Sequence, residues 1–171
     1  LLPMAEEMGL GVTPWSPLKY GILTGKYTRE NKDKIDPARG DWVKNHLQKE
    51  KTYEIVDALI KVAKERDSTP ARVALAWVQA QKPVTSSIIG ARTLEQLNDN
   101  LGALDLTLAP EHMTLLNEVS KVKLNFPYDF IKNSGPFMAA ETTINGETVG
   151  VSPMAPKTDA ERFDKVPAAC K

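Results

Sequence analysis

A basic and polar stretch near the middle of the chain carries the side chains best suited to hold an anion. Arg92 follows Gly90 and precedes Thr93 and Gln96, which form the S/T-x-x-E/Q pattern that opens a helix. A helix N-terminus presents unpaired backbone N–H groups and a partial positive charge, and the planar guanidinium of arginine suits phosphate. The spacing therefore predicts a phosphate site beside Arg92.

The helix that begins here has two different faces. Gln96 and Asn100 lie one turn apart on its polar face together with Asp99, and we expect the two amides to bond a base or a sugar beyond the phosphate. The other face repeats leucine at helical spacing and is expected to pack inward. These leucines are Leu94, Leu97, Leu101 and Leu104. An ordinary capped surface helix explains the same residues equally well, so both interpretations stay open on this pattern.

The segment after the first predicted strand is dense in turn-forming and donor residues. Gly21 and Gly25 allow close backbone approach or a positive φ, and Ser16 offers a hydroxyl donor. Lys26 is suited to a phosphate, although a solvated surface lysine is the commoner case. The ring of Trp15, at the end of that strand, is suited to stacking on a flat ligand, although simple packing is commoner.

Alternating helices and short apolar strands must position these two segments. Apolar periodicity predicts strands at 12–15 and 84–89 and helices at 48–66, 71–81 and 110–121. The charged stretch 28–40 is expected to be a solvated loop. Short strands separated by helices favour parallel βα units, so the expected fold class is α/β.

The periodicity fades towards the C-terminus. Prolines, glycines and serines beyond Lys123 predict a loop-rich tail, and Asn145-Gly146 is a strong signal for a hairpin turn. We therefore expect two parts, residues 1–122 and 123–171.

Composition excludes several classes of protein. The 171 residues are 42% apolar and 26% charged, enough to bury a core. Basic and acidic side chains number 22 each, so no net charge favours nucleic acid or an anionic membrane as a partner. The one cysteine, Cys170, excludes an internal disulfide framework and fits a reducing compartment. No apolar run approaches the roughly 20 residues of a membrane span. We expect a soluble, cytoplasmic protein.

The sequence contains no recognisable catalytic motif or pair of catalytic residues. His46 and His112 are far apart and are each expected to stand alone in polar helical surroundings. The sequence contains no Cys/His metal spacing, no P-loop, no G-x-S-x-G and no G-x-G-x-x-G. We predict no metal site and assign no catalytic residue.

The two polar segments together resemble the aldo/keto reductases, closest to the bacterial branch related to potassium-channel β subunits. The first reads W-S-P-L-x-x-G-x-L-T-G-K-Y over residues 15–27, and the second I-I-G-A-R-x-x-x-Q-L-x-x-N over residues 88–100. The helix at 68–77 between them also matches. The resemblance runs from Leu1 to about Lys121, and the tail matches only at N-F-P-Y-D-F.

This resemblance implies a fold and a cofactor. The family folds as an eight-stranded (β/α) barrel with its site at the C-terminal ends of the strands, and the chain resembles the last two strands and their helices. The implied cofactor is NADP(H), because a 2′-phosphate needs a cation such as Arg92. By resemblance, Trp15 stacks on the nicotinamide. The residues implied to line the pyrophosphate are Ser16, Pro17, Leu18, Lys19, Tyr20 and Lys26. Those implied to hold the adenosine and its 2′-phosphate are Gly90, Arg92, Gln96, Asp99 and Asn100.

The family's catalytic tyrosine, lysine, aspartate and histidine find no match in this sequence. The four tyrosines, Tyr20, Tyr27, Tyr53 and Tyr128, do not fit the motif of the catalytic one. The full-length protein is expected to reduce a small carbonyl substrate, an aldehyde or a ketone, while this chain alone is expected to be inactive.

Two other functions stay open. One is a noncatalytic nucleotide-sensing or interaction protein similar to a channel β subunit; the other is a phosphate-binding barrel half with different chemistry. The first nine residues read as the end of a helix, which indicates a missing upstream part. Two barrel strands alone leave edges unpaired, so we expect partial disorder, aggregation or a homo-oligomer.

Overall fold

The computed structural model describes residues 1–31, 40–144, 146–152, 154–158 and 161. It divides into two compact units, Leu1–Lys121 and Val122–Lys171, which are taken separately here. Most of the predicted loop at 28–40, and Cys170, lie outside the described residues.

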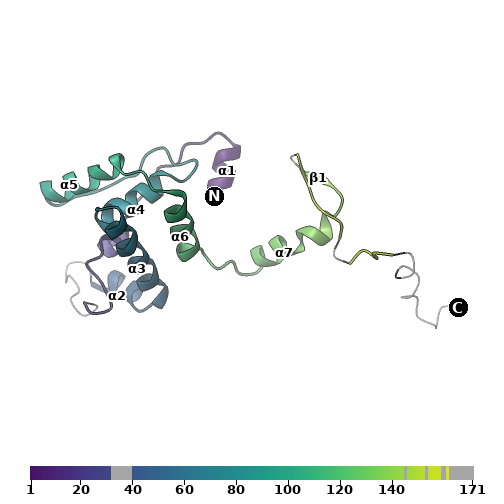
Figure 1. Cartoon of the computed structure of the whole chain (residues 1–171), viewed down its shortest axis with the longest axis horizontal. Coiled ribbons are helices and arrows are strands. Elements are labelled where there is room, and N and C mark those ends of the chain that lie inside the picture. Colours follow the sequence, from purple (N-terminus) through teal and green to yellow (C-terminus); the bar gives the residue numbers. More distant parts are fainter. Residues whose placement is uncertain (32–39, 145, 153, 159–160, 162–171) are drawn as a thin grey trace. The chain divides into compact units, whose positions relative to one another are not determined.

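Short helices dominate the first unit (Figure 1). In chain order they are α1 (Leu2–Glu7), the 3₁₀ helix η1 (Lys19–Thr24), α2 (Gly40–Leu47), α3 (Glu50–Glu65), α4 (Pro70–Gln79), α5 (Leu94–Leu101), the 3₁₀ helix η3 (Gly102–Asp105) and α6 (Pro110–Ser120). The helices predicted at 48–66, 71–81 and 110–121 are confirmed as α3, α4 and α6, with ends that differ by at most two residues.

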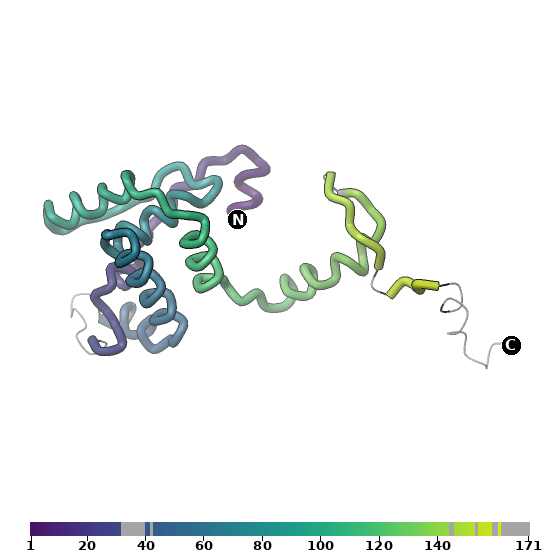
Figure 2. The backbone as a smooth tube through the Cα atoms, viewed as in Figure 1, coloured from purple at the N-terminus to yellow at the C-terminus, as the bar shows by residue number. Residues whose placement is uncertain are grey.

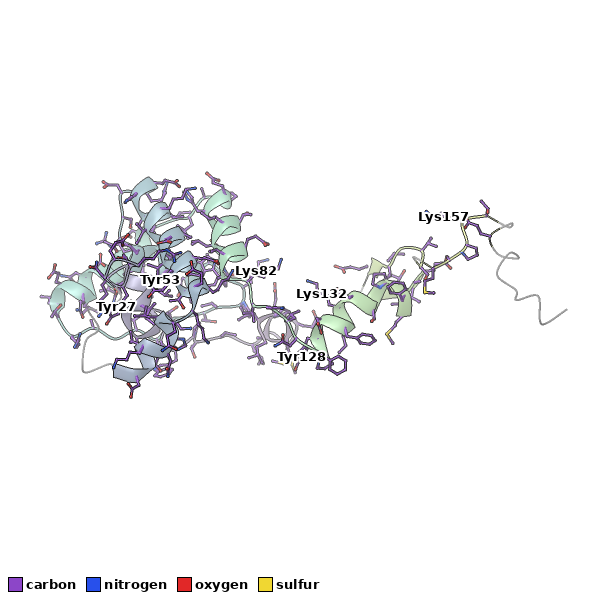
Figure 3. All side chains as sticks on the ribbon, turned by 90° about the horizontal axis from the view of Figure 1, so that it is seen from below. Tyr27, Tyr53, Lys82, Tyr128, Lys132 and Lys157 are labelled. Carbon is purple, nitrogen blue, oxygen red and sulfur yellow. The ribbon has the colours of Figure 1, made fainter. Side chains whose placement is uncertain are left out.

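The core of this unit forms where α3 packs against α4 and α6. The apolar residues predicted on α3 face inward, since Val56, Leu59 and Ala63 are all buried. The first core cluster consists of Ala58, Leu59, Val62, Ala63, Val73, Ala74 and Leu116. The second consists of Ile22, Tyr27, Val43, Leu47, Tyr53 and Val56, of which Figure 3 labels the two tyrosines. Because Ile22 and Tyr27 belong to the second cluster, the core anchors the η1 segment.

The two predicted strands lie side by side in parallel, but they pair only at single points (Figure 2). Val12 pairs with Val84, and Trp15 pairs with Ile88. The backbone N–H of Ile88 donates to the carbonyl of Pro14 at 2.9 Å. The prediction of continuous strands at 12–15 and 84–89 is therefore wrong for this chain. Among the described residues no third extended segment pairs with either one, and an extended segment with a single neighbour lacks most of its ladder.

Helix α5 is oriented opposite to the prediction. Its leucines are exposed rather than inward: Leu94 by 72%, Leu97 by 38% and Leu101 by 46%, with Leu104 just beyond the helix at 73%. Asn100, expected on the free face, is instead 7% exposed. The polar face contacts α4 through ionic and hydrogen bonds, and no described segment covers the leucines, so the polar contacts decide which face turns inward.

The second unit holds α7 (Tyr128–Met138) and a hairpin of β1 (Thr143–Ile144) and β2 (Glu147–Thr148). The strands pair antiparallel with Thr143 opposite Thr148, so the predicted hairpin is confirmed. Helix α7, where Figure 3 labels Tyr128 and Lys132, was not predicted, because it contains Pro136 and buries none of its residues. Among the described residues, no helix is both long and apolar enough to cross a membrane.

Candidate functional site

A cavity of about 810 Å³ in the first unit joins the two polar segments that the sequence singled out. This volume lies within the range of roughly 300–1,000 Å³ that is usual for small-molecule sites. All twelve predicted site residues line it: Trp15, Ser16, Pro17, Leu18, Lys19, Tyr20, Lys26, Gly90, Arg92, Gln96, Asp99 and Asn100. The structure thus brings together residues up to 85 positions apart, while nucleotide binding by them stays a prediction.

The parallel pairing explains how the two segments meet. Trp15 and Ile88 pair in parallel near the C-terminal ends of the two extended segments, so the loops that follow these segments begin side by side at the same edge. Loops that follow the carboxyl ends of neighbouring parallel strands gather at that edge, which is where ligands bind in open α/β folds. The start of α4 supplies a third side of the cavity through Thr69, Pro70 and Ala71, which the sequence analysis did not include in the site.

The segment after Trp15 is held in an unusual backbone conformation. Ser16, Lys19 and Tyr20 all adopt a positive φ, between 46° and 58°, although none is glycine. Left-handed conformations of this kind cost non-glycine residues about 1–3 kcal/mol each and gather at binding and active sites. Gly25 closes the segment at φ 80°, and a Cβ there would lie 2.9 Å from the Pro70 side chain, so glycine lets the loop approach α4.

An exposed aromatic face lies on one side of the cavity. Trp15 is 71% exposed, and its ring meets the Tyr20 ring edge-on, with centroids 6.5 Å apart and an angle of 86° between the planes. This contact orients the indole while leaving most of it accessible. An accessible, oriented indole is suited to stacking on a flat aromatic ligand.

The start of α5 has the predicted cap. The backbone N–H of Gln96 donates to the Thr93 hydroxyl at 3.2 Å, and the side-chain oxygen of Gln96 accepts from the Arg92 backbone N–H at 3.0 Å. The second bond differs from a standard capping box, in which the Glu or Gln side chain accepts from the backbone N–H of the capping residue itself. It ties the backbone of Arg92 to the first turn of the helix, so the arginine is placed at the helix entrance.

Asp99 is held by two residues of α4. Arg72 Nε lies 2.8 Å from Asp99 Oδ1 and 3.0 Å from the Asp99 carbonyl oxygen. The Thr69 hydroxyl lies 3.0 Å from Asp99 Oδ2. The sequence analysis singled out neither Thr69 nor Arg72 as a site residue, because nothing local indicates a partner 27 or 30 residues away.

Neither histidine belongs to the cavity lining. His112 does not stand alone as predicted: it is 9% exposed, and its Nε2 lies 3.2 Å from Glu65 Oε2 on α3. The pairing of α3 with α6 buries it. Among the described residues, no three His, Cys, Asp or Glu side chains lie close enough together to hold a metal ion.

We expect His46, on α2, to make the stability of the first unit depend on pH. Partial burial lowers the pKa of His46 below its ordinary value of 6.5, and the charges of Lys19 and Lys49 lower it further. The folded state therefore binds fewer protons than the unfolded state when the pH falls below about 6.5. Above that pH, we expect the contribution of His46 to the free energy of unfolding to be fully present. The free energy of unfolding should fall as the pH drops through the folded-state pKa, and it should fall less in His46→Gln. Urea unfolding of both proteins between pH 7.5 and 5 measures this difference, and equal slopes would contradict it.

Comparison with protein-family models and comparison with known proteins point to the same family. The model of the aldo/keto reductase family matches residues 1–121. The chain is 40% identical to "Uncharacterized oxidoreductase YrpG" of Bacillus subtilis over 120 residues, which cover 70% of this chain and 35% of that protein. It is 28% identical to "Probable aryl-alcohol dehydrogenase AAD4" of Saccharomyces cerevisiae over 132 residues, covering 77% and 40%. It is 33% identical to "Putative voltage-gated potassium channel subunit beta" of Schizosaccharomyces pombe over 150 residues, covering 74% and 37%. The chain thus spans less than half the length of these relatives.

Proposed function

The chain belongs to the aldo/keto reductase family, and on that basis we propose that its first unit is the nucleotide-binding part of an NADP(H)-dependent reductase of aldehydes or ketones. One observation carries this proposal: a single cavity gathers an exposed indole, three cationic side chains and a capped helix start. These are the groups needed for a nicotinamide ring, a pyrophosphate and a 2′-phosphate.

In this proposal each part of the cofactor has its own partners. Trp15 stacks on the nicotinamide, and the strained loop from Ser16 to Tyr20, with Lys26, lines the pyrophosphate. Gly90 and Arg92 hold the 2′-phosphate because they precede the N-terminus of α5. The amides of Gln96 and Asn100, one turn apart, serve the adenosine. The cofactor supplies hydride chemistry, while these residues bind and orient it.

The whole protein is proposed to be a cytoplasmic (β/α) barrel in which the paired segments at 12–15 and 84–88 are the last two strands. Within the barrel each would gain a second neighbour, and the leucines of α5 would gain a cover. No residue of this chain matches the family's catalytic four, so we propose that this chain alone binds the cofactor but does not reduce a carbonyl.

The test is thermal unfolding of the chain, followed by circular dichroism, with NADPH, NADP, NADH or no nucleotide. A ligand that binds only the folded state adds about 2.7 kcal/mol at 100 times its dissociation constant, which raises the unfolding midpoint by several degrees. We expect NADPH and NADP to raise the midpoint and NADH to raise it less. An unchanged midpoint with every nucleotide would refute the proposed function.

A noncatalytic nucleotide-sensing role is the second candidate, because two of the similar proteins are named as potassium channel β subunits. A fusion of the chain to the N-terminal part of the Bacillus subtilis relative discriminates the two roles. NADPH oxidation by the fusion with a panel of aldehydes and ketones supports the reductase, whereas NADPH binding without oxidation supports the sensor. A phosphate-binding protein of other chemistry would keep its affinity for the nucleotide in Trp15→Ala.

A further inference from the structure

One carboxylate lies among the cationic side chains of the cavity. The described residues that line it include three cationic side chains, Lys19, Lys26 and Arg92, and a single acidic one, Asp99. An unpaired carboxylate in an anion site opposes the ligand by like-charge repulsion. The state of Asp99 therefore determines how strongly the cavity favours a phosphate.

Asp99 is not unpaired, because Arg72 sits against it from outside the cavity lining. Arg72 Nε is 2.8 Å from Asp99 Oδ1, and the pair is partly buried, with side-chain exposures of 37% for the arginine and 29% for the aspartate. Thr69 bonds the other carboxylate oxygen at 3.0 Å and also caps α4, since the Arg72 backbone N–H donates to its hydroxyl at 3.2 Å. The first turn of α4 thus supplies both the cation and the hydroxyl.

The backbone of α5 is shaped to admit this arginine. A Cβ at Gly102, the residue after α5, would lie 2.7 Å from both Cζ and Nε of Arg72, so a side chain there would displace the guanidinium from its present position. Arg72 Nε also bonds the Asp99 carbonyl at 3.0 Å, one of the last carbonyls of α5, which have no partner within the helix. The same side chain therefore neutralises the carboxylate and fixes the helix that carries Gln96 and Asn100.

We propose that Arg72 is a positioning residue that determines cofactor preference: by pairing with Asp99, it neutralises the one negative charge among the described lining residues and so favours a nucleotide with a 2′-phosphate over one without it. This inference rests on the proposed function. It concerns the choice between NADPH and NADH rather than nucleotide binding as such.

The experiment compares the dissociation constants of NADPH and NADH, measured by calorimetric titration, for the unaltered chain and for Arg72→Gln. Glutamine keeps a donor but removes the charge. We expect NADPH to bind about tenfold more weakly to the variant and NADH to change less than twofold. Adding Asp99→Asn to Arg72→Gln removes the exposed carboxylate and is expected to restore most of the preference. Arg66→Gln, which changes another arginine outside the cavity lining, is the matched control and should leave both constants unchanged.

The outcomes separate the two proposals. Equal weakening of NADPH and NADH in Arg72→Gln means a purely structural role and overturns the inference, as does an unchanged preference. An unaltered chain that binds neither nucleotide refutes the proposed function, and the inference with it. If circular dichroism shows that Arg72→Gln does not fold, Arg72→Lys is measured instead. Because lysine retains the charge, the preference for NADPH over NADH should stay within about threefold of that of the unaltered chain, and a loss of this preference overturns the inference.

Discussion

Replacing Arg92 with glutamine is expected to weaken NADPH binding by about 10- to 100-fold and to leave NADH binding nearly unchanged. Charge-assisted hydrogen bonds to a phosphate contribute about 1.5–3 kcal/mol each, and NADH lacks the 2′-phosphate that would use them. Arg92 is exposed at the edge of the cavity, and its backbone is fixed by Gln96, so the substitution removes charge without opening a core. Calorimetric titration of both nucleotides into both proteins measures the effect.

The matched control for this prediction is Lys64→Gln, which removes an exposed cation of α3 that does not line the cavity. We expect it to leave both dissociation constants within twofold of the unaltered protein. Equal losses for NADPH and NADH in Arg92→Gln would show that the arginine does not contact the 2′-phosphate. A loss of the same size in the control would show that the nucleotide responds to overall charge alone.

The substitution Leu59→Ala is expected to lower the free energy of unfolding by about 2–5 kcal/mol. Leu59 is 3% exposed and packs in the cluster that joins α3, α4 and α6. Removing its three side-chain methyl and methine carbons deletes apolar contacts and leaves a cavity that these helices cannot fully close. Because α3 also contacts η1, nucleotide binding should fail through unfolding of the unit and return at low temperature. Urea unfolding measures the change in free energy.

The same chemical change on α5 provides the control. Leu94 is 72% exposed, so Leu94→Ala is expected to change the free energy of unfolding by less than about 0.5 kcal/mol. A loss as large as that of Leu59→Ala would mean that the leucine face of α5 is covered in solution, by a second copy of the chain for example. Light scattering of the unaltered chain would then reveal the oligomer.

The sequence alone located α3, α4, α5 and α6, and it singled out the two segments that line the cavity, because these signals are local. Residues three or four apart determine the amphipathic pattern of α3, and the Thr93 cap of α5 spans only three positions. The positive φ angles of Ser16, Lys19 and Tyr20 left no such signal, since none of these residues is a glycine. Local patterns singled out residues that line one cavity, but they did not indicate the backbone conformation of these residues.

What only the tertiary structure decided is which face of α5 is covered. The leucines of α5 form an apolar stripe, yet the helix turns its polar side inward, because the start of α4 meets it with the polar side chains of Thr69 and Arg72. That choice depends on Arg72 and Thr69 meeting Asp99 across 27 and 30 positions. An apolar stripe on a helix indicates which face is favoured to be buried. Whether that face is buried depends on the segment that packs against the helix, which can lie far away in the sequence.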